Sequence, residues 1–122
     1  MPADVPVPVV WAVVCIALLV AEHIYALVTP PFGLHVPFFF HLTFAVLYGW
    51  LGIEVWNGAG WALITLTALL TTQAVGRVFV WRAEQRSYAV VVKTVLAAGF
   101  ALTVVALALL WIPAPARAHL FG

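Results

Sequence analysis

The chain contains very few charged residues. Only 7% of its 122 residues are Asp, Glu, Lys or Arg, whereas charged residues make up about a quarter of a typical soluble domain. Hydrophobic residues account for 66%, so water is not the main solvent of this chain. The formal net charge is only +1, and no basic run is interleaved with aromatic residues. These properties argue against nucleic acid as a partner.

Residues that carry covalent catalysis or bind metals are also scarce. Cys15 is the only cysteine, so the chain can form neither an internal disulfide nor a cysteine-based metal cluster. Ser87 is the only serine, and neither residue lies in a hydrolase or zinc motif. We therefore expect no metal site and no soluble-type hydrolase. Whether the chain is an enzyme of another kind, and which cofactor it would use, stay open.

Four apolar runs of about 20 residues fill most of the chain. A helix of about 20 residues, rising about 1.5 Å per residue, crosses the roughly 30 Å hydrocarbon core of a bilayer. The pattern predicts an all-α polytopic membrane protein in which four transmembrane helices form an antiparallel bundle. This bundle is expected to be a single membrane domain, with spans at about 9–28, 38–56, 61–81 and 88–112.

Prolines and glycines separate the runs. The connection at 29–37 contains three prolines and a glycine, which predicts a helix stop and restart. The connection at 57–60 is so short that the helices on either side must form an antiparallel hairpin. Pro113 and Pro115 end the fourth span, and the tail after them is expected to be short and flexible.

Most of the basic residues gather on one side of the predicted bundle. Arg77, Arg82, Arg86 and Lys93 are four of the five Lys and Arg residues, and they lie in or near the connection between the third and fourth spans. Because cytoplasmic loops of membrane proteins carry an excess of Lys and Arg, the charged 82–88 loop is predicted to face the cytoplasm. Both termini would then lie outside the cell membrane. All of these except Arg77 are interpreted as orientation charges that reach the interface.

The spans also place polar side chains near this same face. Glu22 and His23 lie close to the end of the first span, and His41 is about 4.5 Å inside the second. Arg77 is about 6 Å inside the third span, and Gln73 lies deeper. Ionisable groups inside a bilayer usually face the bundle interior and pair, so these five residues are predicted to form a ligand or proton site built on a Glu22–Arg77 ion pair. A pair that only holds the bundle in register is equally consistent with the pattern.

Helical spacing assigns polar and small residues to particular helix faces. The face of the first span predicted to point inward consists of Trp11, Cys15, Leu18, Glu22, Tyr25 and Thr29. The corresponding face of the second span consists of His41, Ala45, Tyr48 and Gly52. A face of small residues on the third span, on which another helix could approach closely, consists of Ala68, Thr72 and Gly76.

Three functions are compatible with these residues. The polar layer could bind or move a small or lipophilic molecule, with Glu22 exchanging a proton and the histidines tuning it. Alternatively, the chain is an accessory subunit of a larger membrane complex, without chemistry of its own. A third hypothesis is an anchor subunit for a b-type haem or a quinone, with His23 and His41 as haem ligands. Besides the lipid bilayer, a homo-oligomer or a larger complex is the expected partner, because four short helices bury little surface among themselves.

Two family resemblances involve short parts of the chain. The small size, the four spans and Glu22 in the first span resemble the small multidrug resistance transporters, which work as dimers. Their glycine-rich third-span signature is absent here. The segment RVFVWRAEQR at 77–86 is similar to the arginine-rich helix end of the membrane-associated eicosanoid and glutathione enzymes, which are small four-helix trimers. The Asn and Glu of that motif do not match in position, so the chain is assigned to neither family.

Overall fold

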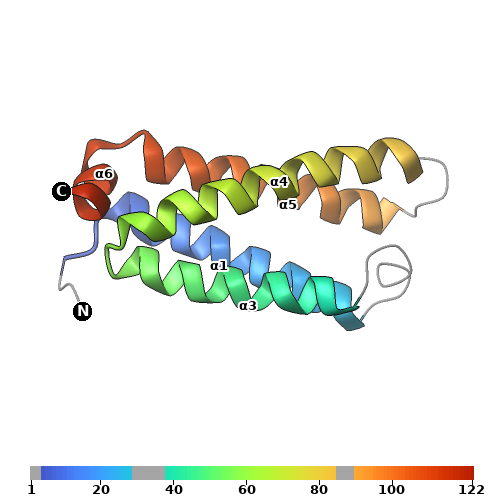
Figure 1. Ribbon diagram of the computed structural model, residues 1–122. Helices are drawn as coiled ribbons and strands as arrows, with labels where there is room; N and C mark the ends of the chain where they lie inside the picture. The colour runs from blue at the N-terminus through green and yellow to red at the C-terminus, as the bar shows by residue number, and fades with distance from the viewer. Residues whose placement is uncertain (1–3, 29–37, 85–89) are drawn as a thin grey trace.

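The computed structural model describes residues 4–28, 38–84 and 90–122, and all regular structure within them is helical. The prediction of an all-α fold is confirmed. Four long helices lie side by side and a short one lies at one end of them (Figure 1). Their bounds are α1 Val7–Val28, α3 Phe38–Trp56, α4 Gly60–Glu84, α5 Val90–Trp111 and α6 Ala114–Phe121. By length and composition, each of the four long helices could cross a membrane.

Each long helix overlaps the span that the sequence predicts for it, and consecutive long helices run in opposite directions (Figure 1). The proline-rich connection at 29–37 lies outside the described residues, as do Arg86 and Ser87 of the charged loop. Of the other orientation charges, Arg82 is exposed and Lys93 is partly exposed. The assignment of the whole chain to one membrane domain stays a prediction.

Helix α1 packs along α3 on one side and along α5 on the other, while α4 packs against α3 and α5. Helices α1 and α4 therefore lie diagonally across the bundle. The core between the helices is made of large aliphatic side chains and one tyrosine. Its fully buried members include Ile16, Leu19, Tyr48, Leu51, Leu63, Leu66, Leu70 and Leu110.

The outward surface of the long helices is also apolar. Leu18 on α1, Val46 on α3, Phe79 on α4 and Val104 on α5 are each at least half exposed, at 50, 63, 68 and 51%. Soluble monomers rarely expose continuous apolar surfaces of this kind. The surface therefore suits contact with lipid or with another apolar protein surface.

The hydroxyl groups of three exposed threonines have hydrogen-bond partners within their own helices. The hydroxyls of Thr65, Thr72 and Thr94 each donate to the carbonyl oxygen four residues earlier in the same helix, at 3.0, 2.9 and 2.8 Å. A hydroxyl with such an internal partner does not need water. These side chains can therefore face hydrocarbon without leaving a donor unpaired.

One of the two predicted inward faces is partly wrong. On α3, Ala45, Tyr48 and Gly52 are buried as predicted. On α1, Cys15 is buried and the Glu22 side chain is only 13% exposed, but Trp11, Leu18 and Tyr25 are 58, 50 and 40% exposed, and Thr29 lies outside the described residues. The buried residues of α1 are Val9, Ala12, Cys15, Ile16, Leu19, His23 and Ala26. Glu22 and His23 are adjacent polar residues on neighbouring faces of an otherwise apolar helix, so the sequence period could not select between these faces, and packing against α3 and α5 decided the rotation.

The expectation of a flexible tail is also wrong, because the tail forms α6. Pro113 is extended and forms the N-cap, and Pro115 lies in the first turn, where a missing backbone N–H breaks no helical hydrogen bond. The two prolines that stop α5 thus also permit a new helix to start. Ala116 and Leu120 are buried against the end of the bundle, and this burial holds α6 in place.

Hydrogen bonds fasten α6 to the ends of two long helices. His119 Nε2 donates to the carbonyl oxygen of Trp56, at 2.9 Å, near the end of α3. Arg117 Nη1 donates to the carbonyl oxygens of Trp111, at 2.8 Å, and Ile112, at 2.5 Å. Carbonyls at a helix C-terminus have no partner within their own helix, so Arg117 caps the end of α5. We call this end of the bundle the α6 end.

The turn between α3 and α4 is expected to depend on Gly58. Its φ is +86°, and a Cβ at this position would lie 2.9 Å from the carbonyl oxygen of His119. Gly58→Ala should lower the free energy of unfolding by ~1–3 kcal/mol, because an alanine would be strained and would press on the α6 backbone. Unfolding titrations in detergent micelles measure this loss. Gly76→Ala is the control, since nothing lies within 4 Å of a Cβ there; equal stability of the two variants would contradict the expectation.

Candidate functional site

Glu22 of α1 and Arg77 of α4 form an ion pair across the bundle. Arg77 Nη1 donates to Glu22 Oε2 at 2.6 Å, and Arg77 Nη2 donates to Glu22 Oε1. The side chains of Arg77 and Glu22 are only 10 and 13% exposed. Two parallel charge-assisted hydrogen bonds are the strongest geometry available to such a pair. The structure therefore contains the predicted pair in a well-buried, two-pronged form.

The pair needs space on α5, and Gly99 provides it. A Cβ at position 99 would lie 2.5 Å from Glu22 Oε2 and would overlap the Arg77 guanidinium group. The missing side chain thus lets the pair lie directly against the α5 backbone. Sequence reasoning missed Gly99, although a single glycine in an apolar helix is a signal of close approach.

His23 lies next to Glu22 and is only 4% exposed. Its Nδ1 is 2.9 Å from the carbonyl oxygen of Leu19, and its Nε2 is 3.0 Å from Oε1 of Gln73. Both partners are acceptors, so His23 satisfies both contacts only as an imidazolium with two N–H groups. As a neutral imidazole it needs the Gln73 amide turned so that the NH₂ group faces Nε2.

The spacing of Gln73 and Arg77 along α4 explains how Glu22 and His23 can both contact that helix. They are consecutive on α1, and Gln73 and Arg77 are four residues apart, which places the latter two on one stripe of α4. Glu22 meets Arg77, and His23 meets Gln73. Helix α1 thus uses two adjacent faces to reach one stripe of the diagonal helix.

His41 and Tyr48 of α3 complete the cluster. The rings of both residues contact the His23 ring, with centroids 5.9 and 5.4 Å from it. Within the described residues, both ring nitrogens of His41, the Tyr48 hydroxyl and Arg77 Nε are buried without a hydrogen-bond partner. Buried polar atoms in folded proteins nearly always have a partner. This group of unpartnered atoms is therefore the feature of the cluster that needs an explanation.

All five predicted residues lie in this one cluster, which we call the polar layer: Glu22, His23, His41, Gln73 and Arg77, joined by Tyr48. Tyr48 was predicted to face inward but not to belong to the site. Its burial follows from the spacing of its helix face, whereas its place beside His23 depends on how α1 and α3 pack. That the polar layer is a working site stays a prediction.

The two histidines of the haem hypothesis, His23 and His41, lie with their ring centroids 5.9 Å apart. That hypothesis stays a prediction. Among residues 4–28, 38–84 and 90–122, no group of three or more His, Cys, Asp and Glu residues is placed to hold a metal ion.

In comparisons with known proteins, no protein-family model, no curated protein and no solved structure matches the chain. The resemblances based on Glu22 and on the 77–86 segment therefore carry no functional assignment. The interpretation of the polar layer rests on its geometry and chemistry.

The Glu22–Arg77 pair can be measured with a double-mutant cycle. Glu22→Gln alone and Arg77→Gln alone each leave a buried charge without its partner, and each should destabilise the protein by ~3–5 kcal/mol. The double variant should lose clearly less than the sum of the two losses. Unfolding titrations of all four proteins in the same detergent give the coupling. Simple additivity of the two losses would show that the pair is not formed.

Gly99→Ala tests the position of the pair against α5. The added methyl group should destabilise the protein by ~1–3 kcal/mol, because the paired side chains cannot move apart freely. In an Arg77→Gln background, where the guanidinium group is absent, the loss should become much smaller. Gly49→Ala on α3 is the matched control, since nothing lies within 4 Å of a Cβ there. If Gly99→Ala lowers the stability by the same amount in the Arg77→Gln background, the added methyl group does not clash with the ion pair.

Proposed function

We propose that the chain is an integral membrane protein whose four long helices span the bilayer as an antiparallel bundle. Support comes from the four long apolar helices and from their apolar outward surface. By the distribution of Lys and Arg, the charged 82–88 loop lies on the cytoplasmic side and both termini lie outside. Trp56, Trp61 and Trp111 lie near helix termini at the α6 end, where an interfacial aromatic belt is expected.

We further propose that the polar layer binds a small or lipophilic molecule through a hydrogen-bonding head. The observation that carries this proposal is the set of buried polar atoms without partners. Arg77 Nε is a donor, the Tyr48 hydroxyl can both donate and accept, and a neutral His41 adds one donor and one acceptor. The Arg77 Nε donor carries a positive charge, so the complementary head presents at least one acceptor such as a carbonyl or carboxylate oxygen.

Glu22 remains the proposed site of proton exchange in the polar layer, with His23 and His41 beside it. Both oxygens of Glu22 accept hydrogen bonds from Arg77, so an exchange there would open the ion pair.

A second candidate function is that of an accessory subunit in a larger membrane complex. Ala68, Thr72 and Gly76 form a small-residue face on α4, and all three are exposed. Nothing lies within 4 Å of a Cβ at Gly76. A helix from another copy or from another protein could approach α4 closely along this face.

Ligand retention distinguishes the two functions. The protein is purified from membranes in mild detergent, and its bound small molecules are extracted and quantified by mass spectrometry. The wild-type protein is expected to retain a lipophilic molecule at about one per chain. The double variant His41→Leu/Tyr48→Phe should retain at least about tenfold less, because it removes three of the unpartnered polar atoms.

Thr72→Val is the matched control for this experiment, because the Thr72 hydroxyl bonds only its own helix in the structure. It should retain the ligand at the wild-type level. If the double variant and the wild type carry the same molecules in the same amounts, the polar layer does not bind a ligand. Stoichiometric co-purification of a larger membrane protein in that case would favour the accessory subunit.

A further inference from the structure

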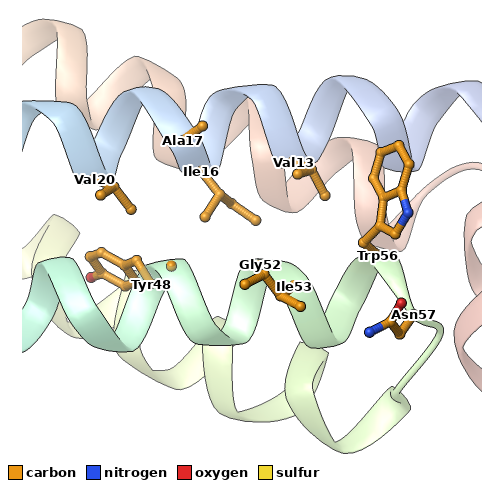
Figure 2. Close-up of a pocket in the computed structure, with 10 residues that line it drawn as sticks. Val13, Ile16, Ala17, Val20, Tyr48, Gly52, Ile53, Trp56 and Asn57 are labelled. Carbon is orange, nitrogen blue, oxygen red and sulfur yellow. The ribbon is translucent and has the colours of Figure 1, made fainter. Parts of the chain in front are cut away.

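An apolar groove lies between α1 and α3, next to the polar layer. It has a volume of about 560 Å³. Figure 2 shows Val13, Ile16 and Val20 of α1 along one wall, opposite Tyr48 and Gly52 of α3. Its lining is almost entirely hydrocarbon and ring surface.

Glycines on α3 open this groove. At Gly49 nothing lies within 4 Å of a Cβ position, so a side chain there would extend into free space. At Gly52 a Cβ would lie 3.2 Å from Cγ2 of Ile16, so the two helices are in close contact there. The groove is therefore a concave surface whose floor is the close contact between α1 and α3.

The two ends of the groove differ. Tyr48 lies at the inner end, where its ring contacts His23 and so separates the groove from the polar layer (Figure 2). Trp56 and Asn57 lie at the other end, which is the α6 end (Figure 2). Trp56 Nε1 is buried without a hydrogen-bond partner within the described residues. The groove thus has an apolar body and hydrogen-bonding groups at its outer end.

The length of the groove matches one leaflet of a bilayer. Tyr48 and Asn57 are nine residues apart, which corresponds to about 13 Å along a helix. Half of a hydrocarbon core of about 30 Å is about 15 Å. The groove therefore extends from the middle of the bundle to the interface, as a lipid chain of one leaflet does.

We propose that this groove binds one acyl chain of a membrane lipid from the leaflet at the α6 end. The chain lies along Val13, Val20 and Gly49, with its methyl end towards Tyr48. The polar head lies at Trp56 and Asn57, whose N–H groups donate to ester or phosphate oxygens. The proposal rests on membrane insertion, which is part of the proposed function, but not on a ligand in the polar layer.

A helix of a second copy does not fit this groove. Spread over about 13 Å, the volume corresponds to a cross-section of about 40 Å². An α-helix with its side chains is about 10–12 Å in diameter, which is roughly twice that area or more. A hydrocarbon chain is narrow enough, and hydrocarbon is what surrounds α1 and α3 in a bilayer.

Photocrosslinking in vesicles tests the proposal. The full chain is reconstituted into phosphatidylcholine vesicles that contain a small fraction of phosphatidylcholine with a diazirine in one acyl chain. A diazirine near the methyl end should label Val20 and Tyr48, and one near the head should label Val13 and Ile53. We expect labelling of these residues to exceed that of Ile64 and Phe79, exposed apolar residues of α4, by about fivefold or more.

Matched variants separate the groove from general lipid contact. Gly49→Leu fills the groove and should lower this labelling about fivefold or more, whereas Gly76→Leu adds the same side chain at an open position outside it. Gly76→Leu should label like the wild type. Trp56→Phe keeps an aromatic ring but removes the N–H donor. It should therefore reduce the labelling of Val13 and Ile53 by the diazirine near the head.

Two results would overturn the proposal. Labelling spread evenly over all exposed apolar residues, or unchanged by Gly49→Leu, would show that no chain is held in the groove. Vesicle flotation before irradiation tests membrane insertion separately. A chain that fails to float with the vesicles would contradict the membrane assignment itself, and the lipid site with it. A chain that floats but labels evenly would contradict the lipid site alone.

Discussion

The structure depends on one interaction, the ion pair between Glu22 and Arg77. The side chains of Glu22 and Arg77 are only 13 and 10% exposed, so little water can solvate their charges and each needs the other as a partner. The pair joins α1 to α4, which lie diagonally and make little direct contact with each other. It therefore links these two helices at one depth of the bundle, in addition to the packing of each helix against α3 and α5. Gly99 allows this by leaving room on the helix between them.

The pair also divides the bundle into two chemically different halves. The histidines and Gln73 lie on the same side of Tyr48 as the ion pair. Several buried polar atoms there have no hydrogen-bond partner within the described residues. On the other side, towards α6, the space between α1 and α3 is lined by hydrocarbon. One aromatic ring separates the two, with its hydroxyl group in the polar layer. Tyr48 thus keeps the polar and the apolar environment of the bundle apart.

Much of the polar layer could be predicted from the sequence, because ionisable residues are rare in apolar helices and must meet inside the bundle. Glu22, His23, His41, Gln73 and Arg77 stand out for that reason. Gly99 and the role of Tyr48 could not be predicted in the same way. A glycine and a tyrosine are ordinary residues in a membrane helix, and their importance comes from the neighbours that packing brings to them.

The sequence by itself determined that the fold is all-α, that its four long helices are apolar, and which ionisable side chains interrupt them. These properties follow from composition and from the length of each apolar run, which are local. Only the tertiary structure decided which stripe of α1 is buried, that the tail folds into α6, and where a groove opens beside Gly49. Each of these depends on contacts between distant segments. An apolar helix has no polar face to indicate its rotation, and the short tail helix is stabilised by burial against the bundle.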